Sequence, residues 1–454
     1  MLSVNLDRKR SNLPSRFQPE VRHLASFSPD LLSSGPAPRS QVEFLTGKAG
    51  TGKSFALKRF ADSQQGRCIV LAPTGLAAQN VGGQTIHSFF RIPPRTLNDP
   101  KVEVRRFMRG DHRLKAIQEC EWIVIDEVSM VRADLLDAVD WSLRKNLDSN
   151  LPFGGKRVLL VGDLAQLPPV VKRNAEQEFI VHRYGGSPYF LSSRVMQEVA
   201  WRVWVLTRSY RHADDDRFLN LLGLLRDGDD SCIEAFNERV RGILPRARVT
   251  VLTARKNTAN EINERRLAKL PGEADTITRD VRVYDEAGHR QAQDEHDLPV
   301  PYHLFLKPEA RVMLLKNGPG YANGSLGTVV ELGGETIVVR LDSGNLVSVE
   351  RAVWEQIRFV WNPVEKRIDH QVVSEYIQFP MTLAWAITVH KSQGLTLRAC
   401  AIDLGAGAFA HGQFYVAVSR VPTFDSFSLK QPLQDSDIAV DHVVRDFHAS
   451  IGLH

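Results

Sequence analysis

The sequence predicts an α/β fold in which parallel strands carry a phosphate-binding loop. The first observation is the complete G-x-x-x-x-G-K-[ST] spacing of Gly47–Ser54, which follows an apolar run at Val42–Leu45 and precedes a helical stretch at Phe55–Ala61. The second is the alternation of short apolar runs with longer helical patterns along most of the chain. The third is a change of texture at Arg311–Phe359, where valine, leucine and glycine alternate between turn signals and predict a small all-β insertion.

The loop Gly47–Ser54 is typical of a nucleoside triphosphate site. Its glycines let backbone N–H groups turn toward phosphates, and the following helix N-terminus favours negative charge. Lys53 would reach the β- and γ-phosphates, and the Ser54 hydroxyl would bind Mg²⁺. The alternative is a glycine-rich turn that matches by chance, and the flanking strand and helix disfavour it. The candidate nucleotide-binding residues are Gly47, Gly50, Thr51, Gly52, Lys53, Ser54 and, from a later stretch, Gly394.

The remaining elements of this fold are predicted from apolar runs that end in polar residues. Such endings matter because sites form at the carboxyl ends of parallel strands. A second set of elements begins near Val203. The predicted strands are Cys68–Leu71, Trp122–Ile125, Arg157–Val161, Val249–Thr253 and Cys400–Leu404, and the predicted helices cover Val131–Leu143, Thr258–Lys269 and Gln413–Ser419.

An acid pair and a glutamine follow two of these strands. Asp126 would hold Mg²⁺ through water, and Glu127 would polarise the water that attacks the γ-phosphate. A strand-end turn is the alternative for this pair. Gln166, within Gly162–Pro169, could contact the γ-phosphate or orient water without carrying charge. On local chemistry alone, a proline-stiffened loop is the favoured interpretation of that stretch.

Two later arginines, Arg211 in a Tyr-Arg-His triplet and Arg420 after an apolar helix, are candidates for stabilising charge on the γ-phosphoryl group. A solvated surface charge is the usual role of any one arginine among 58 Lys and Arg residues. The combination with the loop and the acid pair favours the catalytic interpretation.

Several hydroxyl, imidazole and ammonium groups are candidates for contacts with a nucleic-acid backbone. Phe89 could stack on a base, although core packing is its alternative, and a capped turn is the alternative for His87. Lys316 and Asn323 could donate to phosphates from the all-β insertion, or Asn323 could merely form a hairpin turn with Gly324. The candidates are Pro73, Thr74, His87, Phe89, Lys316, Asn323, Thr388, His390, Lys391 and Ser392.

The bulk composition is that of a globular chain of 454 residues with a formal net charge of +5, which is compatible with a polyanionic partner. Its four cysteines are widely spaced and predict neither a zinc site nor a disulfide framework, so a reducing compartment is expected. No apolar run has membrane-spanning length, and no membrane partner is expected. Residues 1–40 are expected to be an extension, and residues 285–300 a mobile connection.

The ordered motifs GKAGTGKS, APTGLAA, TIHSFF, DEVSM, PFGG, GDLAQLPPV, YRH, NGSLGTV, ITVHKSQGLT and YVAVSR resemble the PIF family of superfamily-one helicases, related to RecD, from about Phe44 to Pro422. The resemblance implies two RecA-like lobes, at 41–202 and at 203–310 with 360–454. It also implies a wedge hairpin in the first lobe and a small Src-homology-type β-barrel at 311–359. The implied activity is ATP-driven translocation 5′ to 3′ on single-stranded DNA with duplex unwinding in replication, repair or recombination.

The resemblance also assigns residues. It implies that Gly50, Gly52, Lys53 and Ser54 bind phosphate, Asp126 and Glu127 form the acid pair, Gln166 senses the γ-phosphate, and Arg211 and Arg420 pair on it. It implies that Pro73, Thr74, His87, His390, Lys391 and Ser392 line the DNA path. The adenine-reading glutamine of the family has no clean copy, and Gln18 is the only candidate.

We therefore predict an ATP- and Mg²⁺-dependent DNA helicase that binds single-stranded DNA and single/double-strand junctions as a monomer, or as a dimer on DNA. The expected location is the nucleoid-associated cytoplasm in a bacterium, and the nucleus or an organelle in a eukaryote. The alternatives are a DNA-stimulated translocase that separates no strands, a nucleotide-gated DNA-binding scaffold, and a metabolic P-loop kinase.

Overall fold

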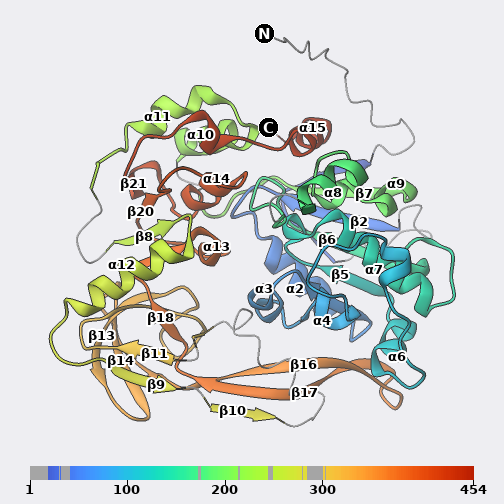
Figure 1. The fold of residues 1–454 in the computed structure, drawn as a ribbon, viewed down its shortest axis with the longest axis horizontal. Coiled ribbons are helices and arrows are strands. Elements are labelled where there is room, and N and C mark those ends of the chain that lie inside the picture. The colour runs from blue at the N-terminus through green and yellow to red at the C-terminus, as the bar shows by residue number, and fades with distance from the viewer. Residues whose placement is uncertain are drawn as a thin grey trace.

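The computed structural model describes residues 19–29, 31, 41–171, 175–212, 215–243, 249–278, 280–283, 300–301 and 303–453. Gln18, most of the expected extension 1–40 and nearly all of the connection 285–300 lie outside the described residues. The described part has two parallel sheets and a β-rich region, which confirms the α/β class (Figure 1). None of its helices is long and apolar enough to cross a membrane.

The first sheet has seven parallel strands, and three of them, at Val42–Gly47, Cys68–Ala72 and Trp122–Ile125, are buried along their whole length. Continuous apolar runs such as Phe44–Leu45 form strands covered on both faces, because crossover helices pack on each side of a parallel sheet. In spatial order the strands are β1 (Glu20–Leu24), β7 (Trp201–Leu206), β2 (Val42–Gly47), β6 (Arg157–Val161), β5 (Trp122–Ile125), β3 (Cys68–Ala72) and β4 (Gln84–Thr85).

The helices that belong to the first part of the chain surround this sheet (Figure 1). The longest, α7, buries the apolar face that its spacing predicts, together with polar residues such as Asp137 and Asp140. The helices are α2 (Lys53–Ser63), α3 (Gly75–Asn80), α4 (Ile86–Phe90), α5 (Pro100–Glu103), α6 (His112–Glu119), α7 (Ala133–Asn146), α8 (Ala175–Tyr184) and α9 (Arg194–Glu198).

The second sheet is a smaller parallel sheet with a separate core. Its strands, in spatial order, are β19 (Ala386–Thr388), β8 (Thr250–Thr253), β20 (Cys400–Asp403) and β21 (Phe427–Leu429). The helices of this part of the chain are α10 (Asp216–Asp227), α11 (Ile233–Asn237), α12 (Lys256–Ala268), α13 (Val389–Ser392), α14 (Gln413–Val418) and α15 (His442–Ser450).

The β-rich region contains a five-stranded antiparallel sheet and a long hairpin. The sheet has the order β15 (Leu346–Glu350), β14 (Thr336–Leu341), β13 (Leu326–Leu332), β12 (Arg311–Leu314) and β18 (Met381–Leu383). Strand β11 (His303–Leu306) pairs with β9 (Asp275–Thr278). The hairpin consists of β16 (Ala352–Asn362) and β17 (Arg367–Gln378), and β10 (Asp280–Val283) lies along β17.

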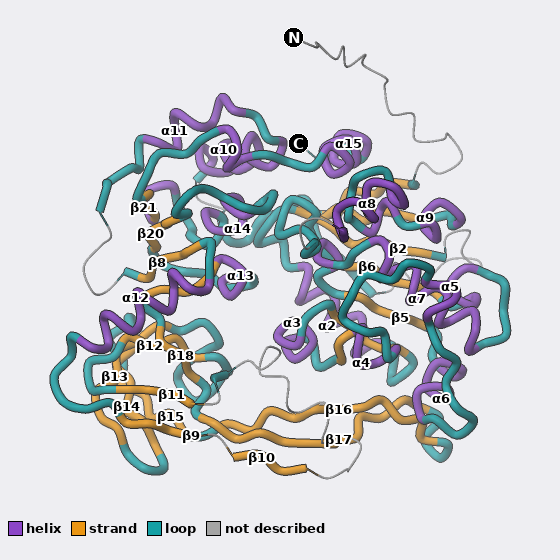
Figure 2. Tube along the Cα trace, viewed as in Figure 1, coloured by secondary structure: helices purple, strands orange, loops and turns teal. Residues whose placement is uncertain are grey.

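The hairpin β16–β17 extends from the β-rich region to the first lobe (Figure 2). Its end joins the core of that lobe, where Phe359 is 1% exposed and its ring centroid lies 5.9 Å from that of Phe89. The Ile368 N–H donates to the Gly66 carbonyl at 2.9 Å, and Gln84 donates to the Ile357 carbonyl. The hairpin therefore ties the inserted region to the first lobe.

We expect Phe359→Ala to weaken this attachment, because it removes a buried aromatic ring and leaves a cavity, at a cost of about 3 kcal/mol in the free energy of unfolding. Denaturant unfolding would measure the loss. Val364→Ala is the matched control, since Val364 lies in the turn of the same hairpin and is 85% exposed. Equal stability of the two variants would contradict the attachment.

Several expected boundaries differ from the structure. Glu20–Leu24, expected to lie in an extension, is an edge strand of the first sheet, and all of β7 belongs to that sheet although residues from 203 onward were expected in the second lobe. Residues 360–378 belong to the hairpin rather than to the second lobe. Phe447 of α15, also expected in the second lobe, stacks on Trp201 with ring centroids 5.7 Å apart. Apolar contacts between distant segments decide these boundaries, and local patterns do not report them.

The expected wedge hairpin of the first lobe is absent from the described residues 41–171 and 175–202. All strand ladders there are parallel, and the one antiparallel contact is the isolated bridge between Arg132 and Tyr189. The segment after α4 contains Pro93 and Pro94, which lack the N–H groups that a strand ladder needs.

Candidate active site

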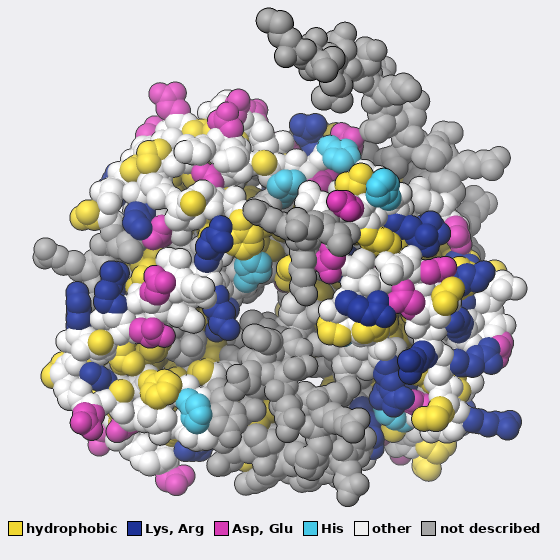
Figure 3. Space-filling model, viewed as in Figure 1, with side chains coloured by type: hydrophobic (Ala, Val, Ile, Leu, Met, Phe, Trp, Pro, Cys, Tyr) yellow, Lys and Arg dark blue, Asp and Glu magenta, His cyan; other side chains and the backbone are white. Residues whose placement is uncertain are grey.

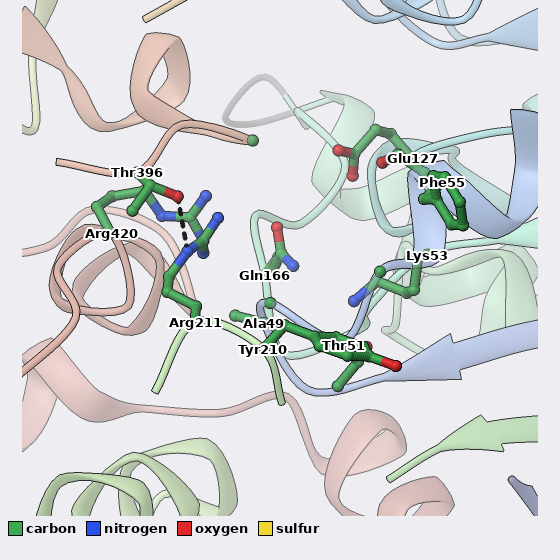
Figure 4. A pocket seen from close by; sticks show the side chains of 14 residues that line it. Ala49, Thr51, Lys53, Phe55, Glu127, Gln166, Tyr210, Arg211, Thr396 and Arg420 are labelled. Atoms are coloured by element: carbon green, nitrogen blue, oxygen red, sulfur yellow. Dashed lines mark hydrogen bonds between the residues drawn. The ribbon is translucent and has the colours of Figure 1, made fainter. Parts of the chain in front are cut away.

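A cavity of about 490 Å³ brings together the five predicted catalytic residues (Figure 4). Lys53, Glu127 and Gln166 come from the first sheet and its loops, whereas Arg420 follows α14 of the second lobe. Arg211 lies in the segment that joins the two lobes. The lining residues are Ala49, Gly50, Thr51, Gly52, Lys53, Ser54, Phe55, Glu127, Gln166, Tyr210, Arg211, Gly394, Thr396 and Arg420.

The phosphate loop joins β2 to α2 in the predicted order. Gly50 has a φ of 79°, and a Cβ atom there would lie 2.7 Å from the Cβ of Arg211, so the position requires glycine. The Lys53 ammonium donates to the carbonyls of Gly47 at 2.8 Å and Lys48 at 3.1 Å. Burial lowers the pKa of Lys53, while Asp163 and Glu127 oppose the shift. An ammonium held only by loop carbonyls is free to exchange them for phosphate oxygens.

Asp126 and Glu127 lie where β5 ends. Asp126 is 6% exposed, and Glu127 adopts the left-handed conformation with a φ of 48°. Burial raises the pKa of both carboxyls, and the charge of Glu127 raises that of Asp126 further. Two adjacent carboxyls, of which Asp126 is buried and Glu127 half-buried, fit a divalent cation, which would relieve their repulsion.

Gln166 is joined to a buried ion pair that the sequence analysis did not identify. Its amide nitrogen donates to Asp163 at 3.3 Å, and Asp163 accepts from Arg226 at 3.0 Å. Both side chains of the pair are fully buried. Burial would raise the pKa of Asp163, but Arg226 and Lys53 hold it below its usual value. The pair fixes the loop that carries Gln166 against α10.

We expect Arg226→Met to lower the free energy of unfolding by about 3–5 kcal/mol, because it leaves the Asp163 carboxylate buried without its cation. Thermal or denaturant unfolding measures the effect. The exposed pair of Arg217 and Glu238 lies on the same helix and supplies the control, since Arg217→Met should cost about 1 kcal/mol or less. Similar losses in the two variants would contradict a structural role of the buried pair.

The two predicted arginines lie together across the cavity from Lys53 and Glu127 (Figure 4). Arg211 donates to the Thr396 hydroxyl at 3.0 Å and to the Ser419 carbonyl at 3.1 Å. Arg420 donates to the Ser419 hydroxyl at 2.8 Å, and burial together with Arg211 lowers its pKa to about 9. Two crowded guanidinium groups favour an anionic ligand between them and the loop.

Sequence reasoning missed two exposed aromatic rings of the cavity. Phe55 is 68% exposed and Tyr210 is 57% exposed, and both line it. Their positions next to Ser54 and Arg211 were the available signal. Thr396 and Gln393 were also not predicted, because their hydrogen-bond partners lie far away in the sequence.

Two of the residues predicted to contact nucleic acid cap the N-termini of helices with their side-chain hydroxyls. Thr74 accepts from the Ala77 N–H at the start of α3, and Thr388 accepts from the Lys391 N–H at the start of α13, both at 3.2 Å. Pro73 precedes the first of these caps. His87 is half-buried and lies in the short helix α4, which Thr85 caps, so its place is compatible with the alternative of a capped turn.

Other candidates vary in their exposure. Lys391 is exposed, and the ring of His390 stacks on that of Phe409 with centroids 6.2 Å apart. Asn323 is exposed in its turn. Lys316 donates to the Val353 carbonyl and lies over the Trp354 ring at 5.0 Å, so its ammonium is already engaged.

Two of the candidates are wrong as side-chain contacts. Phe89 is fully buried and packs against Phe90 and Phe359, so no base can stack on its ring. Ser392 is also fully buried, and its hydroxyl donates to the Val389 carbonyl at 2.7 Å. The hairpin covers Phe89, and the packing of α13 against α14 covers Ser392. The local sequence shows neither contact.

The fold and the cavity define a P-loop nucleotide-binding protein with a site built from two lobes. A family model described as PIF1-like helicase matches residues 30–234. An ATP-dependent DNA helicase Pif1 of Bdellovibrio bacteriovorus is 33% identical over 86% of this chain and 83% of that protein. The ATP-dependent DNA helicase PIF1 of Homo sapiens is 32% identical over 84% of this chain and 57% of that protein. The chain therefore belongs to the PIF1-like helicase family.

Solved structures agree with this assignment. An unliganded Pif1 from Bacteroides sp is 32% identical, has a TM-score of 0.81, and matches 93% of this chain and 95% of that chain. A Bacteroides Pif1 bound to single-stranded DNA has a TM-score of 0.64 at the same identity and coverage. The present structure therefore superposes better on the unliganded relative than on the DNA-bound one.

Proposed function

We propose that this chain hydrolyses ATP between its two lobes and uses the cycle to move 5′ to 3′ along single-stranded DNA and unwind duplexes. The main support for this proposal is one cavity that is lined by the phosphate loop, Glu127 and Gln166 on one side and by Arg211 and Arg420 on the other. Because hydrolysis changes the charge that both sides face, it changes the attraction between the lobes. The helicase relatives and the DNA-bound Bacteroides structure support DNA as the partner.

The charged and polar side chains of the cavity, together with Asp126 next to Glu127, have defined roles in this proposal. Lys53 neutralises the β- and γ-phosphates, Glu127 accepts a proton from the attacking water, and Gln166 orients that water. Arg211 and Arg420 stabilise the charge that develops on the transferred group. Ser54 and Asp126 would hold Mg²⁺, which would neutralise phosphate charge when bound. Phe55 and Tyr210 offer apolar ring faces to a nucleotide base.

The described surface carries basic groups that suit a DNA backbone. Dark-blue Lys and Arg side chains gather on the visible face near the end of the first lobe that holds α6 (Figure 3). Just before α6, Arg105, Arg106 and Arg109 are exposed, and so is Met108, at 73%. In the second lobe, the Arg255 guanidinium lies 5.6 Å from the Phe409 ring centroid, beside His390. Such contacts read the backbone rather than the sequence.

We expect strand displacement on 5′-tailed duplexes and little or none on matched 3′-tailed duplexes, measured side by side with ATP and Mg²⁺. Affinity for single strands should fall steeply with salt and vary little among mixed sequences, because phosphate contacts dominate. Equal unwinding of both tails would contradict the proposed polarity. DNA-stimulated ATP hydrolysis without any displacement would instead favour a translocase that separates no strands.

A further inference from the structure

Gln393 makes a contact between the lobes that the roles proposed above do not use. It directly follows α13, and its side-chain amide nitrogen donates to Glu127 Oε2 at 2.9 Å and to Gln166 Oε1 at 3.3 Å. Glu127 and Gln166 lie beyond the ends of β5 and β6 in the first lobe. One side chain of the second lobe therefore holds both groups that are proposed to handle the attacking water.

The Gln393 amide nitrogen makes the same two hydrogen bonds that a water molecule at this place would make. An amide nitrogen carries two hydrogens, and here they serve the two acceptors that a water would use for its own two hydrogens. The contact also sets the orientation of Gln166, because its oxygen faces Gln393 and its nitrogen donates to Asp163 at 3.3 Å. While the contact lasts, an attacking water cannot be held by Glu127 and Gln166 together.

The segment before Gln393 links this contact to the proposed DNA path. Helix α13 is a single turn, fastened by the cap from Lys391 N–H to Thr388 and by the Ser392 hydroxyl on the Val389 carbonyl. Lys391 is exposed at its surface, whereas Gln393, two residues later, bonds to Glu127 and Gln166. A bound DNA strand that shifts this short, tightly bonded turn would also shift Gln393.

We propose that Gln393 is a positioning residue through which DNA controls hydrolysis. In the DNA-free protein its amide occupies the place of the attacking water between Glu127 and Gln166. Engagement of a single strand by the segment 388–391 withdraws the amide and opens that place. This inference rests on the proposed function, because it assigns Glu127 and Gln166 to the attacking water.

The test compares Gln393→Ala and Gln393→Asn with the unmodified chain. Alanine removes the amide, and asparagine keeps it but is one methylene too short to reach both acceptors. We expect the DNA-free kcat for ATP to rise about tenfold in the alanine variant and less in the asparagine variant, since the lost contact includes a bond to a charged group. The KM for ATP and the kcat with saturating oligo-dT should stay within about twofold, so the stimulation by DNA falls.

Gln197→Ala is the matched control, because Gln197 is an exposed glutamine with a single bond to the Leu191 carbonyl. It should leave all rates unchanged. A DNA-free kcat that stays level or falls in Gln393→Ala would overturn the proposal, since a merely structural role can only lower the rate. If the unmodified chain showed no DNA-stimulated hydrolysis, the proposed function itself would be wrong, and the two failures are thus distinguishable.

Discussion

Lys53→Ala should reduce ATP hydrolysis by ~10³-fold or more, because the loop offers no second charge at the place of the ammonium. The Lys53 ammonium donates to the carbonyls of Gly47 and Lys48 in its own loop and to no other element of the described chain, so its loss should leave the fold intact. Steady-state hydrolysis with saturating oligo-dT measures the effect. Unwinding should be lost in parallel, since it depends on turnover.

Lys58→Ala is the control for this variant. Lys58 lies on the same helix α2, five residues further on, and its side chain is exposed. It should hydrolyse ATP at the unmodified rate. Turnover of Lys53→Ala at the rate of the control would exclude the loop as the active site.

Glu127→Gln should keep nucleotide binding and lose turnover by about 10²–10⁴-fold, because it preserves the shape of the side chain and removes the proton acceptor. Burial raises the pKa of Glu127, which suits a group that must accept a proton. The measurement pairs the affinity for a fluorescent ATP analogue with single-turnover hydrolysis.

The comparison variant for Glu127→Gln is Glu121→Gln, at the exposed entrance of the same strand. Glu121 pairs with Arg67 at the surface and lies outside the cavity. The Glu121→Gln variant should therefore bind and hydrolyse ATP normally. If Glu127→Gln lost affinity and turnover together, Glu127 would be a structural residue of the site.

Local patterns were sufficient for the four central strands β2, β3, β5 and β6 of the first sheet, for the phosphate loop and for the acid pair. A buried parallel strand is a short apolar run whatever surrounds it, and the loop requires its glycines and its lysine at fixed spacing. Strands β5 and β6 have the predicted bounds, and Gly47–Ser54 joins β2 to α2 as expected. The family motifs then indicated which distant residues share one cavity, including Arg420.

The tertiary structure alone decided what covers each side chain. Phe89 is an aromatic residue beside a possible DNA contact in the sequence, but a hairpin about 270 residues later covers it with Phe359. Gln393 resembles any polar residue of its motif until the packing of the second lobe against the first brings it to Glu127. The pair of Asp163 and Arg226 likewise forms only when two lobes meet. Hydrogen bonds and packing between distant segments depend on positions in space, which a period of two or 3.6 residues does not encode.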